Sequence, residues 1–121
     1  MTRATTPIYK RGAIVLADLE PVIGSEQGGM RPCVVLSHPD RIRASRARAL
    51  YVIAPLTRSV TLVGALAPRI KARVGGVPLD STVLVMHIRS LDASRVRSVA
   101  GKLNNVELET IMEGVRQMLE A

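Results

Sequence analysis

The residues best suited to chemistry lie in the segment GSEQGGMRP, residues 24–32, which sits between two apolar runs. Its three glycines allow positive φ angles and a close approach of the backbone to a ligand. Glu26, Gln27 and Arg31 add a carboxylate, an amide and a guanidinium, which a simple hairpin turn does not need. Pro32 favours an extended conformation for Arg31, whose side chain is therefore expected to lie on one face of the next strand. No Gly-Lys-Ser/Thr follows, which excludes the phosphate loop of nucleotide hydrolases.

Two further segments carry candidate side chains. PLTRS, residues 55–59, ends an apolar run and presents the hydroxyl groups of Thr57 and Ser59, although Thr57 also fits a simple turn cap. MHIRSLD, residues 86–92, would place His87 and Arg89 on one face of a strand, because side chains two residues apart share a face. A histidine beside an arginine can bind a phosphate or a base edge, but a single histidine more often has a structural role.

The charge of the chain indicates a polyanionic partner. It carries 17 Lys and Arg against 10 Asp and Glu, a net charge of +7, and most of the basic residues are arginines. Arginine presents a planar fork of donors that matches phosphate oxygens, so nucleic acid is the favoured partner. Residues 40–49 contain four arginines, which form either a basic arm or a solvated loop. The only aromatic residues are Tyr9 and Tyr51, too few for a large base-stacking platform.

A metal site is not expected. One cysteine, two histidines and scattered carboxylates give no ligand set of the usual spacing. The single cysteine, Cys33, also excludes an internal disulfide, and its apolar surroundings favour a buried side chain in a strand. Any catalysis is therefore expected to proceed without a metal ion or another cofactor.

Short apolar runs, separated by Gly, Pro and charged residues, predict five or six strands. Apolar residues near the end recur every three or four positions, which predicts a helix capped by Asn104 and Glu107. Strands and helices do not alternate, which argues against a doubly wound parallel sheet. We expect a mainly β fold, with a small curved antiparallel sheet or partial barrel and a C-terminal helix packed on it. The expected strands cover residues 13–19, 33–37, 49–56, 60–67, 81–88 and 98–102, and the helix covers residues 106–120.

The length of 121 residues predicts one domain over residues 1–121, with residues 1–8 expected to be flexible. The first dozen residues do not resemble a secretory signal. No apolar run approaches the roughly 20 residues that a membrane span needs. The expectation is a cytoplasmic protein without membrane contact.

Taken together, these segments resemble a known family. Residues 11–37, RGAIVLADLEPVIGSEQGGMRPCVVLS, are similar to the opening motif of the MazF/PemK-type toxins of bacterial toxin–antitoxin systems. Residues 52–59, VIAPLTRS, resemble the second motif of that family, and residues 83–96, VLVMHIRSLDASRV, resemble the third. The order and spacing of the motifs match, and the resemblance covers the chain from about Lys10 to Leu119.

The resemblance implies a fold, an activity and partners. The fold is a small SH3-like partial barrel of five to seven strands with a C-terminal helix, shared with the CcdB gyrase poisons. The activity is that of a homodimeric, sequence-specific endoribonuclease that cleaves single-stranded mRNA without a metal ion and so inhibits translation. The implied partner besides RNA is a cognate MazE-like antitoxin, acidic and partly disordered, that blocks the RNA groove.

The resemblance also implies roles for individual residues. Arg31 and Thr57 match catalytic positions, and Glu26 matches an acidic position linked to catalysis. The family usually has Gln where this chain has His87, so His87 is expected to change the base preference or to add a titratable group. Positions expected to contact RNA are Ser25, Gln27, Arg58, His87 and Arg89.

Cleavage is expected to give a 2′,3′-cyclic phosphate, or a 3′-phosphate, and a 5′-hydroxyl. Arg31 suits the stabilisation of the phosphorane and Thr57 can add one hydrogen bond. Arginine stays protonated, with a pKa above about 12, so the role of base is assigned to Glu26, with His87 as a rival. Two alternatives remain: a non-enzymatic gyrase poison of the same fold, and an RNA-binding module without catalysis.

Overall fold

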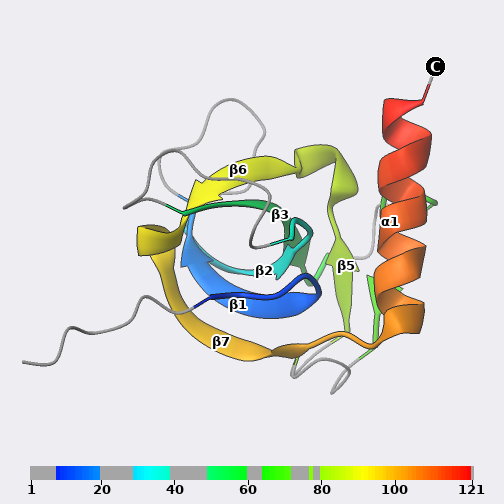
Figure 1. Cartoon of the computed structure of the whole chain (residues 1–121). Helices are drawn as coiled ribbons and strands as arrows, with labels where there is room; N and C mark the ends of the chain where they lie inside the picture. The colour runs from blue at the N-terminus through cyan, green and yellow to red at the C-terminus, as the bar shows by residue number, and fades with distance from the viewer. Residues whose placement is uncertain are drawn as a thin grey trace, which may run out of the picture.

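The computed structural model is a strongly curled antiparallel sheet with one helix packed at its side (Figure 1). It describes residues 8–19, 29–38, 49–59, 64–71, 77 and 80–120. Two 3-10 helices, η2 (Val85–His87) and η3 (Ala93–Arg95), flank the sixth strand. The strands and the α-helix are β1 (Ala13–Asp18), β2 (Met30–Val35), β3 (Leu50–Thr57), β4 (Arg69–Ile70), β5 (Ser81–Val83), β6 (Arg89–Asp92), β7 (Val96–Lys102) and α1 (Asn105–Leu119).

The strands lie in the order β4-β5-β3-β2-β1-β7, and β6 also pairs with β3. Every strand pair among the described residues is antiparallel. In Figure 1, β6, β3, β2, β1 and β7 curl into a ring, with α1 standing beside it. The expected partial barrel with a C-terminal helix is therefore confirmed.

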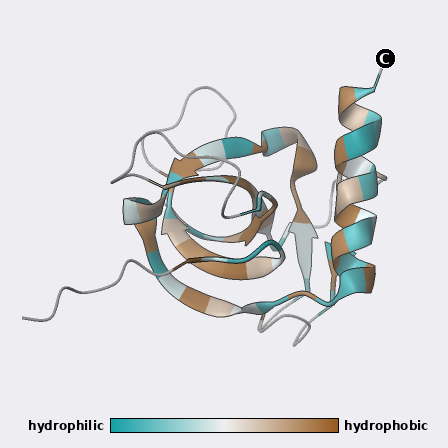
Figure 2. Ribbon diagram, viewed as in Figure 1, coloured by the Kyte–Doolittle hydropathy of each residue, from teal (hydrophilic) through white to brown (hydrophobic). Residues whose placement is uncertain are grey.

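Two apolar clusters hold the sheet in shape. Side chains alternate between the faces of a strand, and in β2 the neighbours Cys33 and Val34 belong to different clusters. Each fully buried aliphatic side chain contributes about 1.5–3 kcal/mol. Figure 2 shows apolar segments along the ring and on the side of α1 that faces the sheet. The helix-side cluster includes Ile14, Val34, Leu56, Val83, Ile111 and Val115. The ring cluster includes Val15, Cys33, Tyr51, Ile53 and Leu91.

The helix begins as the sequence predicts. The Asn104 side chain accepts a hydrogen bond from the backbone N–H of Glu107 at 3.0 Å. In return, the Glu107 carboxylate accepts from the backbone N–H of Asn104 at 3.2 Å, which completes a capping box. Further along, Gly114 packs so tightly that an added Cβ would clash with the carbonyl oxygen of Ala65.

Two of the expected strands are wrong over part of their length. Residues 64–67 form a turn, in which the Ala67 N–H donates to the Gly64 carbonyl at 3.0 Å, and residues 60–63 lie outside the described part of the chain. The strand expected over residues 81–88 ends at Val83 and is followed by η2. β5 and β6 both run antiparallel to β3, but their registers differ by three residues, so the extra residues between them leave the edge of β3 and form η2.

The other strand predictions are confirmed, with shifted ends. β2 begins at Met30, before the expected residue 33, and β7 begins at Val96, before residue 98. The short strand β4 was not predicted. The expectations for residues 1–7 and for the arginines of residues 40–48 lie outside the described residues. Within the described ranges, none of the helices is both long and apolar enough to cross a membrane.

Candidate functional site

Arg31 and Thr57 lie on neighbouring strands, β2 and β3. The β2–β3 ladder ends at the pair Cys33 and Pro55, and Arg31 and Thr57 each lie two residues beyond this last pair. Both residues line one pocket of about 270 Å³. This pocket opens between β2, the end of β3 and the start of β5. Its other lining residues are Met30, Pro32, Leu56, Arg58, Val77 and Ser81.

The backbone of Arg31 is fixed from the β1 side. Arg31 pairs with Ala17 in the β1–β2 ladder, and Met30 pairs with Asp18. Beyond this pair the Leu19 N–H donates to the Gly29 carbonyl at 3.0 Å, which closes the neck of the hairpin. Gly29 has a φ of 74°, a left-handed conformation that glycine adopts without steric cost. Arg31 therefore enters the pocket from a stretch of β2 that is paired with β1.

Thr57 has the turn-capping role that the sequence left open. Its Oγ1 accepts a hydrogen bond from the backbone N–H of Ser59 at 3.2 Å. The Ser59 carbonyl in turn accepts from Thr82 Oγ1 at 2.9 Å, which ties the turn to β5. A hydroxyl has one donor and two acceptor lone pairs, so Thr57 can still donate its proton to a ligand. Turn capping and ligand binding are therefore compatible at this residue.

Cys33 is buried, as predicted. It lies on the same face of β2 as Arg31, because side chains two residues apart in a strand share a face. Burial raises the pKa of its thiol to about 12, although the positive charges of Arg89 and Arg31 act in the opposite direction. The thiol is thus neutral at physiological pH and a poor nucleophile. It also donates a hydrogen bond to the Arg31 carbonyl, with a distance of 3.4 Å from sulfur to oxygen. The thiol therefore lies within electrostatic range of two guanidinium groups, those of Arg31 and Arg89.

The structure brings together some of the predicted residues and separates others. Arg58 is exposed and lines the pocket with Arg31 and Thr57. Neither His87 nor Arg89 lines this pocket. The predictions for Ser25, Glu26 and Gln27 lie outside the described residues.

His87 ends η2 instead of lying in a strand, so the expectation that it shares a strand face with Arg89 is wrong. Its backbone N–H donates to the Leu84 carbonyl at 3.0 Å, as the 3-10 turn requires. Among the described residues, its buried Nδ1 has no hydrogen-bond partner. An unpaired buried polar atom typically costs about 1–3 kcal/mol. His87 is thus a half-buried side chain with unused hydrogen-bonding capacity.

Sequence reasoning did not assign five residues of the pocket wall to the site: Met30, Pro32, Leu56, Val77 and Ser81. Ser81 reaches the pocket because β5 pairs with the end of β3, where Thr57 is opposite Thr82. Met30, Pro32 and Leu56 carried a local signal, since each is next to Arg31 or Thr57 in the chain. No set of His, Cys, Asp and Glu side chains in the described ranges is arranged to hold a metal ion.

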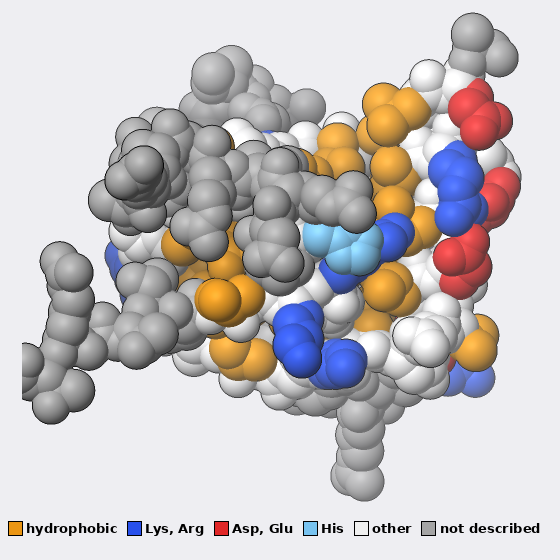
Figure 3. Space-filling view, in the orientation of Figure 1, with side chains coloured by type: hydrophobic (Ala, Val, Ile, Leu, Met, Phe, Trp, Pro, Cys, Tyr) orange, Lys and Arg blue, Asp and Glu red, His pale blue; other side chains and the backbone are white. Residues whose placement is uncertain are grey.

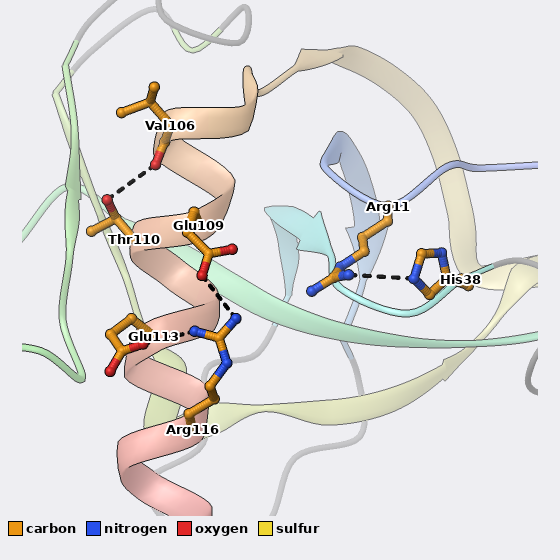
Figure 4. Close-up of polar contacts among 7 residues, drawn as sticks. All are labelled: Arg11, His38, Val106, Glu109, Thr110, Glu113 and Arg116. Carbon is orange, nitrogen blue, oxygen red and sulfur yellow. Dashed lines mark hydrogen bonds and ion pairs between the residues drawn. The ribbon is translucent and has the colours of Figure 1, made fainter.

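A larger hollow of about 910 Å³ lies between α1 and residues 64–69, away from the predicted site residues. Two of its lining carboxylates, Glu109 and Glu113, are bonded to Arg116 at 2.8 and 2.7 Å (Figure 4). Figure 3 shows acidic side chains gathered with basic ones over the helix. Carboxylates repel phosphate, so the smaller pocket is the better candidate for a polyanionic ligand.

Comparison with known proteins agrees with the fold and the motifs. Residues 10–119 match the sequence model of a family described as PemK-like, MazF-like toxin of type II toxin-antitoxin system. The chain is 31% identical over 109 residues to endoribonuclease EndoA of Bacillus subtilis (strain 168), covering 90% of this chain and 92% of that protein.

Solved structures agree. MazF from Deinococcus radiodurans superposes with a TM-score of 0.77 at 24% identity, over 95% of this chain and 99% of that one. The MazE-MazF structure from the same organism gives a TM-score of 0.70 at 26% identity, over 93% and 96% of the two chains. On its motifs, its fold and this match over residues 10–119, the chain belongs to the PemK-like, MazF-like toxin family of type II toxin–antitoxin systems.

Proposed function

We propose that this chain is a toxin that cleaves single-stranded mRNA as a metal-independent endoribonuclease, with its reaction centre in the pocket of Arg31 and Thr57. The observation that carries the proposal is the meeting of these two residues, from separate strands, in one pocket of about 270 Å³. Pockets that bury a drug-sized ligand measure about 300–1,000 Å³, so this one suits a short part of an RNA chain. The relative in Bacillus subtilis, which is named an endoribonuclease, supports the same activity.

The chemistry follows from the donors in the pocket. The 2′-oxygen of the ribose attacks the adjacent phosphorus while the bond from phosphorus to the 5′-oxygen breaks. Arg31 can hold two non-bridging oxygens with its fork, and Thr57 can donate a third hydrogen bond as negative charge develops there. The products are a 2′,3′-cyclic phosphate, or a 3′-phosphate after hydrolysis, and a 5′-hydroxyl.

Two proton transfers complete the reaction. Arg31 cannot act as a base, because arginine remains protonated in proteins. Glu26 is proposed to take the proton of the 2′-hydroxyl, and Arg31 to assist protonation of the leaving 5′-oxygen. His87 is the rival for either proton role, because histidine transfers protons near neutral pH.

RNA binding rests on phosphates and base edges. The two tyrosines of the chain pack edge to face against each other, with ring centroids 5.4 Å apart, and Tyr51 is buried. Tyr51 is therefore closed to a base, and the half-buried Tyr9 alone is not the stacking platform that many single-strand binders use. Contacts to RNA are proposed for Ser25, Gln27 and Arg58. His87 is proposed to influence base preference, and a His87→Gln variant with an unchanged cleavage motif and pH profile would exclude this role.

The biological setting is proposed from the family. A homodimer of single-domain chains acts in the cytoplasm and is held inactive by a MazE-like acidic antitoxin. The MazE-MazF structure from Deinococcus radiodurans supports such a partner. The net charge of +7 suits association with an acidic partner, since complementary charge speeds encounter.

The test is cleavage of a defined RNA pool in EDTA by the wild type and by Arg31→Ala, Thr57→Ala and Glu26→Gln. We expect cleavage by the wild type, with the cut sites mapped to one motif, and a strong loss in each variant. Metal dependence, or full activity of Arg31→Ala, would overturn the proposal. Gyrase inhibition without RNA cleavage would instead identify a gyrase poison, and protection of RNA without cleavage would identify a binding module.

A further inference from the structure

Arg89 links two distant parts of the fold through one side chain. It begins β6, where it pairs with Ile53 of β3. Its Nη1 donates a hydrogen bond of 3.0 Å to the carbonyl oxygen of Leu19, which directly follows β1. Its Nε makes a longer contact of 3.4 Å with the Ser90 carbonyl. The side chain thus reaches from β6 to the end of β1.

The carbonyl group of Leu19 is buried and therefore needs a hydrogen-bond donor from the protein. Leu19 has 0% of its surface exposed, so its carbonyl is removed from water. A buried carbonyl without a hydrogen bond is costly, and Arg89 supplies that bond. The N–H of the same residue donates to the Gly29 carbonyl across the hairpin at 3.0 Å. Leu19 is therefore held from both sides, by β6 and by the residue before β2.

Leu19 is also the residue that ends the ladder carrying Arg31. The last pairs before it are Asp18 with Met30 and Ala17 with Arg31. If Leu19 lost these hydrogen bonds, the last pairs of the β1–β2 ladder would open more often. The backbone of Arg31 would then be held less firmly in position. Arg89 lies on the same face of the sheet as Arg31, because it pairs with Ile53, which pairs with Val35 on that face of β2.

We propose that Arg89 is a positioning residue that holds the Leu19 carbonyl and thereby fixes the end of the β1–β2 ladder from which Arg31 enters the pocket. The role rests on the proposed function, because it assumes that this pocket is the reaction centre. It differs from the RNA contact that the family resemblance implies for Arg89, and Arg89 is not part of the pocket wall.

The two roles make different predictions about salt. A side chain that neutralises one phosphate of single-stranded nucleic acid contributes about 0.7 to the slope of log affinity against log salt. Removing an RNA contact therefore weakens binding and lowers that slope. Removing a positioning residue lowers the rate of the chemical step and leaves binding and slope unchanged, because no phosphate contact is lost.

The experiment compares the full-length wild type with Arg89→Met, Arg89→Lys and a matched control, Arg97→Met. Arg97 lies exposed on β7, and its Nη1 donates to the Ser94 carbonyl at 2.7 Å, so the control removes the same kind of bond elsewhere. Cleavage rates at saturating RNA and KM are measured. Binding to fully 2′-O-methylated RNA is measured at several salt concentrations, and amide exchange of Leu19 is followed by NMR.

For Arg89→Met we expect kcat to fall about ten- to a hundredfold, the scale of a small misplacement of a catalytic group. KM and the salt slope should stay at wild-type values, and the Leu19 amide should exchange faster. Arg89→Lys keeps the charge and one possible hydrogen bond, so it should recover part of kcat. Arg97→Met should match the wild type in every measurement.

An unchanged kcat, or weaker binding with a reduced salt slope, would overturn the proposal. If Arg89→Met does not fold, the split between kcat and KM in Arg89→Lys decides in the same way. A wild type that does not cleave RNA would remove the proposed function, while Leu19 exchange in the variants would still show whether Arg89 holds the neck of the hairpin.

Discussion

Arg31 of β2 and Thr57 of β3 line the same pocket, although 26 positions separate them in the chain. The backbone of Arg31 is held by pairing with Ala17 of β1, and the Thr57 hydroxyl accepts a hydrogen bond from the N–H of Ser59. Such donors need little reorganisation when charge develops on a phosphate, which is the condition for electrostatic catalysis. The pair therefore gives the proposed reaction a pre-formed site.

Arg31→Lys tests the planar fork separately from the charge. Lysine keeps the positive charge but presents it as a compact ammonium without two parallel donors. We expect kcat to fall about 10²–10³-fold, as when one donor to a transition state is lost, with little change in melting temperature. Single-turnover cleavage of a mapped RNA measures the effect, and Arg97→Lys on exposed β7 is the control. Wild-type cleavage by Arg31→Lys would show that the charge alone suffices.

Thr57→Ser and Thr57→Val separate the hydroxyl group from the shape of the side chain. Serine can still accept the hydrogen bond from Ser59, so Thr57→Ser should cleave RNA nearly as well as the wild type. Valine keeps the shape but loses both the acceptor and the donor. Thr57→Val should be nearly inactive and less stable by about 0.5–1.5 kcal/mol, the net value of one hydrogen bond. Urea unfolding beside the cleavage assay checks both effects, and equal activity of the two variants would contradict a role for the hydroxyl.

Local signals predicted the fold best where the structure depends on neighbours in the chain. The capping box of Asn104 and Glu107 needs only four residues in sequence, and it is present. The strand expected over residues 81–88 is interrupted after Val83. The interruption depends on pairing with β3, because β5 and β6 pair with that strand in registers that differ by three residues. Hydrophobic periodicity cannot detect such a shared edge.

The same distinction holds for the site. Motif resemblance selected Arg31, Thr57 and Arg58, which the structure places in one pocket. Ser81 was missed because its place in the pocket depends on the β3–β5 pairing, a contact between residues far apart in the chain. The RNA contact expected for Arg89 stays a prediction. Its bond to the Leu19 carbonyl joins residues 70 positions apart in the chain, and local sequence patterns do not reveal such a contact.

Gly114→Ala should destabilise the protein, against the usual trend for helices. In an exposed helix, replacing glycine with alanine gains about 1 kcal/mol. At Gly114 the new Cβ would clash with the backbone oxygen of Ala65, which cannot move aside as a flexible side chain can. Overpacking of this kind typically costs about 1–3 kcal/mol. Urea unfolding measures the loss, with Gln117→Ala on the exposed face of α1 as the control, and a more stable Gly114→Ala would contradict this packing.

Cys33 should make stability depend on pH in the alkaline range. Burial raises the pKa of its thiol from 9.0 to about 12, so the folded chain keeps a proton that the unfolded chain releases. This contribution is fully present below pH 9 and is lost as pH rises from about 9 toward 12, by up to about 1.4 kcal/mol per pH unit.

Cys33→Ala isolates this effect, because the other titrating groups are the same in both proteins. At pH 7 the variant should be less stable than the wild type, since a buried side chain is shortened. Above pH 9 the wild type alone must also protonate or bury a thiolate on folding, so the difference in unfolding free energy should shrink. Urea unfolding at pH 7, 9, 10 and 10.5 measures this difference. If the difference between the two proteins stays constant across these pH values, the thiol has the same pKa in the folded and unfolded chains. The Cys33 side chain would then be open to water in the folded protein.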